Sequence, residues 1–137
     1  MLLSKNIEMR CAKAAQEIAA TVKDDAYITK VLGILQTDGM FAFFLYLLSE
    51  DEDKANKIID NSETLLIEYK LLPEKSYIRS NTLHKDLQPI TQDLDKLFFA
   101  KDILETTLVY ARYYAKAVND KNPHDNGQPQ EQNGAPQ

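Results

Sequence analysis

The sequence is poor in the residues that build redox, zinc and nucleophilic sites. It has one cysteine, Cys11, and two histidines, His84 and His124, in 137 residues. A single cysteine cannot form an internal disulfide, and so few Cys and His residues cannot form a zinc site of the Cys/His kind. The Gly-rich phosphate loops, the H-E-x-x-H zinc motif and the G-x-S-x-G nucleophile motif are also missing. We therefore expect no enzyme, no cofactor and no metal site, and we interpret Cys11 as a buried, unreactive thiol.

Long apolar runs are missing too. The longest uncharged apolar stretch, residues 39–48, is about half as long as a membrane-spanning helix must be. The N-terminal residues contain no apolar segment followed by a small-residue cleavage site, so they do not read as a secretory signal. The sequence predicts a protein without a membrane anchor that stays in the cytoplasm.

Hydrophobic residues make up 44% of the chain and charged residues 27%, which is an ordinary supply for one modest domain. Residues 121–137 contain no large apolar side chain. Because such a segment cannot bury enough surface to fold, we expect a helical domain over residues 1–120 and a disordered polar tail over 121–137.

The formal net charge is −5, which taken as a whole argues against a protein that coats nucleic acid through excess Lys and Arg. The charge is unevenly spread. Residues 50–95 carry eleven acidic and six basic side chains, whereas residues 1–30 carry five basic and four acidic, and residues 96–121 five basic and three acidic. The first and last parts of the chain can therefore still present a positive surface.

Apolar residues recur every three or four positions, and no stretch alternates in the manner of a strand. The predicted fold class is all-α, a compact bundle of four to five helices. A first helix over residues 4–23 has Ser4 as a plausible N-cap. A second helical stretch over residues 26–48 is either continuous or broken near Gly39.

The next predicted helix begins at Ser49, because Ser49 and Glu52 match a capping box. Pro73 ends this helix, since proline cannot continue one. After a loop and a short helical stretch, Pro89 suits the first turn of a long last helix that reaches about Asn119.

The last predicted helix carries two apolar stripes. One faces the core, and the second, on the nearly opposite face, consists of Phe99, Ile103, Tyr110 and Tyr114. Because one stripe is enough to hold a peripheral helix, the second either lies against another helix of the same chain or forms a partner interface.

Four basic residues lie at helical spacing on the first and last predicted helices: Arg10, Lys13, Arg112 and Lys116. If the two helices are neighbours, these cations and Tyr113 form one patch that could hold a phosphate backbone, with an aromatic ring available for stacking. The other interpretation is a solvated face on which Glu17 and Glu105 pair with the cations. Spacing alone favours the solvated face, because exposed helix charges are common.

Three stretches of the sequence are similar to the small helical subunit of the type III-B CRISPR effector, the Cmr complex. They are residues 10–15, an Arg followed by small residues; residues 27–45, with a leading Tyr and an Asp-Gly turn before an apolar run; and residues 105–117 in the last helix. The resemblance spans most of residues 5–119. This chain has Tyr110 where family members often carry Trp, and it lacks their proline near residues 33–35.

The resemblance implies a non-catalytic filament subunit of a prokaryotic antiviral complex. Such a subunit would stack on neighbouring copies of itself and touch the backbone subunits that hold the guide RNA. Its positive face would line the groove where target RNA pairs with guide RNA. The residues that the resemblance places toward the RNA are Arg10, Lys13, Arg112 and Lys116, and more weakly Lys30.

Two alternatives stay open. The small subunit of the related type III-A effector is also a small helical protein. In the other alternative, the chain is a small helical adaptor or dimerisation protein without a nucleic-acid role, and the second apolar stripe mediates self-association.

Overall fold

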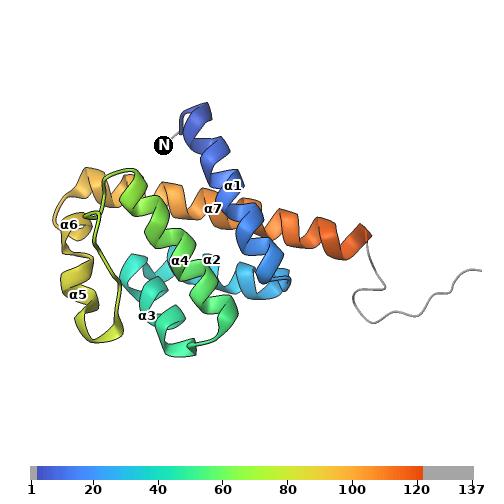
Figure 1. Cartoon of the computed structure of the whole chain (residues 1–137), viewed down its shortest axis with the longest axis horizontal. Coiled ribbons are helices and arrows are strands. Elements are labelled where there is room, and N and C mark those ends of the chain that lie inside the picture. The colour runs from blue at the N-terminus through green and yellow to red at the C-terminus, as the bar shows by residue number, and fades with distance from the viewer. Residues whose placement is uncertain (1–2, 122–137) are drawn as a thin grey trace, which may run out of the picture.

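The computed structural model describes residues 3–121, and these form an all-α bundle without strands (Figure 1). The predicted fold class is therefore confirmed. The helices are α1 (Lys5–Thr21), α2 (Asp25–Asp38), α3 (Met40–Glu50), α4 (Asp53–Glu68), α5 (Leu83–Asp86), α6 (Gln88–Thr91) and α7 (Leu94–Lys121), with a 3-10 turn at Ser80–Thr82. The predicted disordered tail lies outside the described residues, apart from the end of α7.

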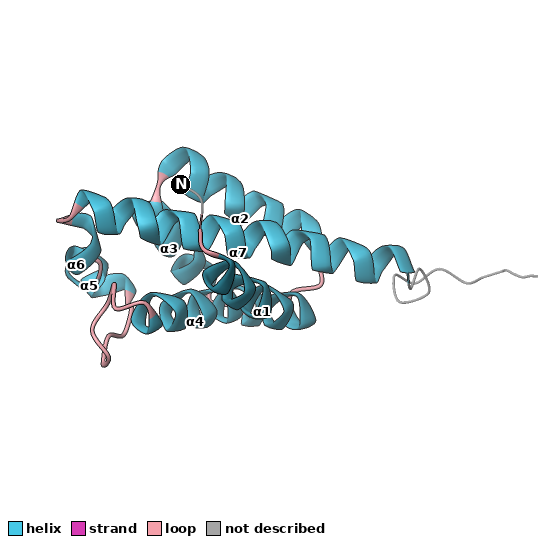
Figure 2. Cartoon of the chain, turned by 90° about the horizontal axis from the view of Figure 1, so that it is seen from above, coloured by secondary structure: helices cyan, strands magenta, loops and turns pink. Residues whose placement is uncertain are grey.

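The long helix α7 runs through the middle of the bundle. Seen from above, α2 lies along one side of α7, and α1 and α4 lie on the other (Figure 2). α1 makes its most extensive contacts with α7, and so does α2. α1 and α7 are thus neighbours, which is the condition on which the patch of four cations and Tyr113 depended.

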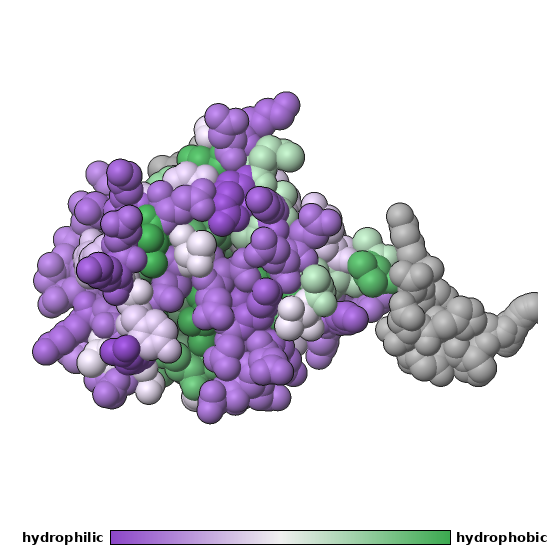
Figure 3. Space-filling model, viewed as in Figure 1, coloured by the Kyte–Doolittle hydropathy of each residue, from purple (hydrophilic) through white to green (hydrophobic). Residues whose placement is uncertain are grey.

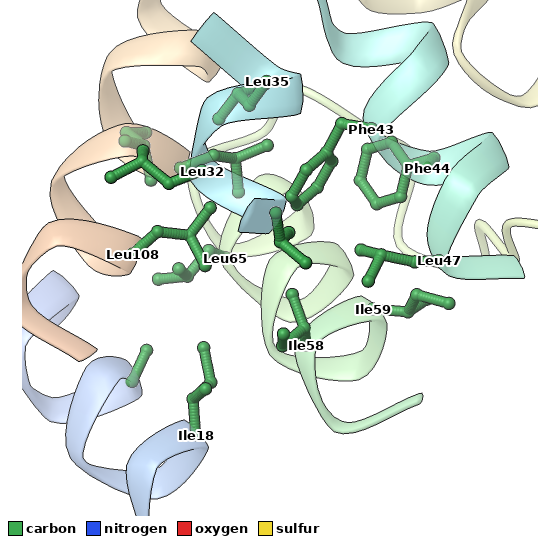
Figure 4. Packing of buried hydrophobic residues seen from close by; sticks show 14 of the residues in the cluster. Ile18, Leu32, Leu35, Phe43, Phe44, Leu47, Ile58, Ile59, Leu65 and Leu108 are labelled. Carbon is green, nitrogen blue, oxygen red and sulfur yellow. The ribbon is translucent and has the colours of Figure 1, made fainter. Parts of the chain in front are cut away.

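The core is a single hydrophobic cluster to which all the longer helices contribute (Figure 4). Phe43 and Phe44 of α3 meet edge to face, with ring centroids 4.9 Å apart. The apolar faces of α2 and α4 pack against α3, and Ile58 and Leu65 from α4 and Leu108 from α7 are fully or almost fully buried. The burial of these faces, rather than any single polar contact, holds the helices in place.

Helix α1 begins where the sequence predicts. The Ile7 N–H donates to Ser4 Oγ at 3.3 Å, so Ser4 is the N-cap. The buried side of α1 is made of small residues and Ile18, including Cys11, Ala14 and Ala15, each 0% exposed. Small side chains allow α1 to approach α7 closely.

Gly39 breaks the second helical stretch into α2 and α3, which decides between the two predicted alternatives. Its φ of 97° and ψ of 179° lie in a region that is essentially open only to glycine. The Gly39 N–H still caps α2, because it donates to the carbonyls of Ile34 and Leu35 at 3.2 Å. The turn lets the strongly apolar α3 fold back onto α2 and α4.

Two glycine substitutions should have opposite effects on stability. A Cβ added at Gly39 or at Gly33 meets no atom within 4 Å. The two substitutions therefore differ in backbone conformation and not in clashes with neighbouring atoms. Gly39→Ala should lower the free energy of unfolding by about 1–3 kcal/mol, because alanine is strained at the positive φ of this position. Gly33→Ala, inside α2, should raise it by roughly 0.5–1 kcal/mol. Chemical denaturation measures both, and equal signs would contradict this explanation of the α2–α3 turn.

The predicted capping box at residues 49–52 is wrong. Ser49 and Glu50 belong to the last turn of α3, and the Ser49 hydroxyl donates to the Tyr46 carbonyl at 2.7 Å. Asp51, with φ 46°, turns the chain, and Glu52 precedes α4 without a side-chain cap. Serine bonds readily to a carbonyl one turn back, and α3 continues to Ser49 because Leu47 is buried.

Helix α4 ends at Glu68, earlier than the predicted stop at Pro73. Lys70 adopts the left-handed conformation, with φ 61°. The Lys70 N–H donates to the Ile67 carbonyl at 3.0 Å, and the Leu71 N–H donates to the Leu66 carbonyl at 2.8 Å. These two bonds form a Schellman motif, which satisfies the last carbonyls of the helix. The sequence did not predict it because glycine, the usual residue at this position, is absent.

The predicted start of the last helix at Pro89 is also wrong. Pro89 lies in the first turn of the short helix α6, and α7 begins at Leu94. Asp93 caps α7, since its carboxylate accepts from the Lys96 N–H at 3.2 Å and its carbonyl accepts from the Leu97 N–H at 2.9 Å. The proline therefore starts a helix of its own, one turn before α7.

Candidate nucleic-acid interface

Arg10 and Lys13, the candidate cations of α1, have different surroundings. The Arg10 Nε–H points to α4, where the Glu68 carboxylate oxygens lie 2.9 and 3.2 Å away. The predicted partner on the same helix, Glu17, is not the acceptor of this ion pair. Lys13 is exposed. Arg10 therefore joins α1 to α4, and a phosphate would have to compete with Glu68 for it.

Arg112 and Lys116, the candidate cations of α7, lie beside an exposed ring. The Arg112 guanidinium carbon is 5.3 Å from the centroid of the Tyr113 ring, within the range of a cation–π contact. The Tyr113 side chain is 60% exposed. Lys116 is exposed one turn further along the helix. These three residues present two positive charges and one aromatic surface to solvent, which suits a phosphate backbone and a stacked base.

Lys30, the fifth candidate, lies on a different surface. Its Nζ is 5.2 Å from the centroid of the Tyr46 ring of α3. Close by, Lys54 Nζ of α4 lies 4.2 Å from the centroid of the Tyr27 ring of α2. Sequence reasoning missed Lys54, because it lies in the acidic middle segment and only the packing of α2 against α3 and α4 brings it to Tyr27.

Among the described residues, only Tyr27 has a buried side-chain polar atom without a hydrogen-bond partner. This atom is its hydroxyl oxygen. Burial is the main cause that raises the pKa of Tyr27, and the negative charges of Glu50 and Glu52 add to it. The ring is therefore neutral under physiological conditions, with Lys54 on its face.

A groove separates α1 from the C-terminal half of α7. We call it the α1–α7 groove; it has a volume of about 460 Å³ and is lined by Glu8, Met9, Ala12, Tyr110, Tyr113, Tyr114 and Ala117. Figure 3 shows a largely hydrophilic face with several small hydrophobic patches, among them one at the top of the view, where α1 lies, and one near the end of α7. The four α1 and α7 cations are not among the lining residues. The groove between the two helices is therefore mainly apolar, with Arg112 beside its lining residue Tyr113.

The second apolar stripe of α7 lies largely against other helices of the same chain, which was one of its two predicted placements. Ile103 is 0% exposed, so its assignment to a partner interface is wrong. Phe99 is partly buried and meets the Tyr69 ring edge to face, with centroids 6.2 Å apart. Tyr110 and Tyr114 line the α1–α7 groove and are the two members that keep exposed surface there.

The buried thiol of Cys11 supports its interpretation as unreactive. Cys11 Sγ lies 3.6 Å from the Ile103 carbonyl oxygen, to which it donates. Burial raises the pKa of Cys11, although a hydrogen bond with Thr107 and the charge of Arg10 act in the opposite direction. A thiol that is 0% exposed and protonated is a poor nucleophile.

The chain shows no significant match to a known protein family, to a curated protein or to a solved structure. Within residues 3–121, no helix has the length and apolar character that a membrane crossing requires. The same residues contain no group of three or more His, Cys, Asp and Glu side chains that is placed to hold a metal ion.

Proposed function

We propose that this protein is a non-catalytic small subunit of a type III-B CRISPR RNA-targeting effector complex, in which it contributes to target-RNA binding. The observation that carries the proposal is the solvent side of α7. Arg112 lies over the exposed ring of Tyr113, and Lys116 follows one turn later. Both cations and the ring belong to the stretch with the resemblance to the Cmr small subunit.

The packing of the helices also supports the proposal. The three stretches that carry the resemblance fall in α1, in α2 and α3 with the turn between them, and in α7, and α7 contacts both α1 and α2. They therefore belong to one structural unit rather than to separate parts of the molecule. Within this unit the buried sides supply the core, and the exposed side of α7 is left for a ligand.

Copurification tests the assignment to the effector. A tagged copy expressed from its native locus should bring down the other effector subunits and a guide RNA, and its gene should lie among genes for such subunits. Arg10→Ala should copurify equally well, because its ion pair with Glu68 is partly exposed, with the Glu68 side chain 43% accessible, and such pairs contribute little stability. Recovery of the chain alone from cells that contain an assembled effector would contradict the proposal.

A second candidate function, self-association without RNA, is favoured by one observation. Met9 and Tyr113 both line the α1–α7 groove and are 62% and 60% exposed, so they offer a contiguous apolar surface that a second copy could cover. In this case sedimentation should show a concentration-dependent dimer that Tyr110→Asp abolishes. A protein that stays monomeric at high concentration would exclude it.

A further inference from the structure

The α1–α7 groove has the composition of a site for a planar ring. Tyr110, Tyr113 and Tyr114 give it three aromatic side chains, all from α7. Ala12 of α1 and Ala117 of α7 are small, so the space between the helices is not filled by their side chains. A volume of about 460 Å³ is within the usual size of small-molecule sites and is larger than a nucleobase requires.

Charge is distributed unequally across the groove. The one charged lining residue is Glu8, on the α1 side. On the α7 side, Arg112 lies against the lining residue Tyr113, with its guanidinium carbon 5.3 Å from the ring centroid. A ligand that complements the groove is therefore aromatic, carries hydrogen-bond donors toward the Glu8 carboxylate and carries negative charge toward Arg112.

An unpaired nucleotide has all three properties, and its base can be specified further. A carboxylate accepts two parallel N–H bonds best, as it does from arginine. Guanine presents two neighbouring donors, N1–H and N2–H₂, on its Watson–Crick edge. Adenine and cytosine place a ring nitrogen acceptor beside a single amino group, and uracil flanks its one N–H with two carbonyls, so each would direct a lone pair toward Glu8.

We infer that the α1–α7 groove binds an unpaired guanine, stacked on Tyr113 or Tyr114, with Glu8 as the acceptor for its Watson–Crick edge and Arg112 near its phosphate. This inference rests on the proposed function, because target RNA is then the source of the base. It goes beyond that function in naming the base, the aromatic surface and the acidic residue that selects it.

Titration of the isolated full chain with 5′-nucleotides tests the inference without the effector. Methionine methyl NMR signals are the probe, because Met9 lines the groove and Met40, 4% exposed in the core, is an internal control. GMP should shift the Met9 signal saturably, with Kd on the order of 1 mM, while AMP, CMP and UMP bind at least about fivefold more weakly. The Met40 signal should not move.

Variants separate stacking from base selection. Tyr113→Ala should weaken GMP binding roughly tenfold, as expected for loss of a stacked base. Glu8→Gln should remove the preference for GMP over the other nucleotides. Tyr77→Ala is the matched control, since Tyr77 is 59% exposed and has Arg79 4.2 Å from its ring centroid, yet lies outside the groove. It should leave GMP binding unchanged.

Several results would overturn the inference: an unmoved Met9 signal, equal responses to all four nucleotides, or an equal effect of Tyr77→Ala. A Met9 shift that depends on protein concentration without nucleotide would instead show a second copy of the chain in the groove. These outcomes are independent of copurification. A chain that assembles into the effector but ignores GMP refutes the guanine site alone, whereas a chain that binds GMP but does not assemble refutes the proposed function alone.

Discussion

Ile103→Asp is expected to abolish folding rather than partner binding. Ile103 is 0% exposed and lies in the part of α7 that α1 covers, with its carbonyl accepting from both Cys11 Sγ and Thr107 Oγ1. A carboxylate there would be buried without a cation, a change that costs more than about 4 kcal/mol, a large part of the stability of an ordinary domain. Circular dichroism should show loss of helix at room temperature.

A milder substitution keeps this prediction measurable if the aspartate variant cannot be purified. Ile103→Ala should fold and lose about 2–5 kcal/mol, from lost burial and the remaining cavity. Phe98→Asp is the matched control on the same helix, because Phe98 is 54% exposed, and it should change stability by less than about 1 kcal/mol. A folded Ile103→Asp protein of normal stability would show that the α1–α7 packing described above is wrong.

The double variant Arg112→Glu/Lys116→Glu is expected to weaken target-RNA binding by the assembled effector roughly 15-fold or more at physiological salt. Each lost phosphate contact removes the release of about one counterion, which lowers the affinity for a single strand about fourfold near 0.15 M salt. The introduced carboxylates also repel the RNA backbone. Lys116 is exposed and Arg112 is only partly buried, so the fold should be unaffected. Filter binding of a labelled target RNA measures the change.

The control for this experiment is Arg79→Glu, which reverses the same type of charge beside the same type of ring. Arg79 lies over Tyr77 with 4.2 Å between the guanidinium carbon and the ring centroid, in the loop before the 3-10 turn and away from α7. It should leave target affinity unchanged. If it weakens binding as much as the α7 variant, the effect comes from net charge rather than from the face of α7.

Much of the fold could be predicted from the sequence because the determinants are local. The apolar period of 3.6 residues predicts helices, and a serine before the first apolar turn predicts the cap at Ser4. A glycine between two apolar helical runs marks Gly39 as a possible break, although only the structure shows the φ of 97° that makes glycine necessary. Local signals thus predicted the elements, with errors of a few residues at their ends.

The site was harder to predict because it depends on tertiary contacts. Helical spacing placed Arg10 with Lys13 but could not show that Arg10 reaches Glu68, which is 58 residues away in the sequence. The same spacing assigned Ile103 to an outer stripe, since a helical projection cannot show that both α1 and α2 pack against α7. The α1–α7 groove has no sequence signal of its own, because it forms only where α1 and α7 pack together.

The salt dependence of target-RNA affinity tests most directly whether the solvent side of α7 contacts the RNA backbone. For effectors assembled with the wild-type chain or with Arg112→Glu/Lys116→Glu, the slope of log Kd against log salt should differ by about 1.4, which corresponds to two phosphate contacts on a single strand. The wild-type complex should have the steeper dependence. Parallel slopes and equal affinities would contradict a role for Arg112 and Lys116 in binding target RNA.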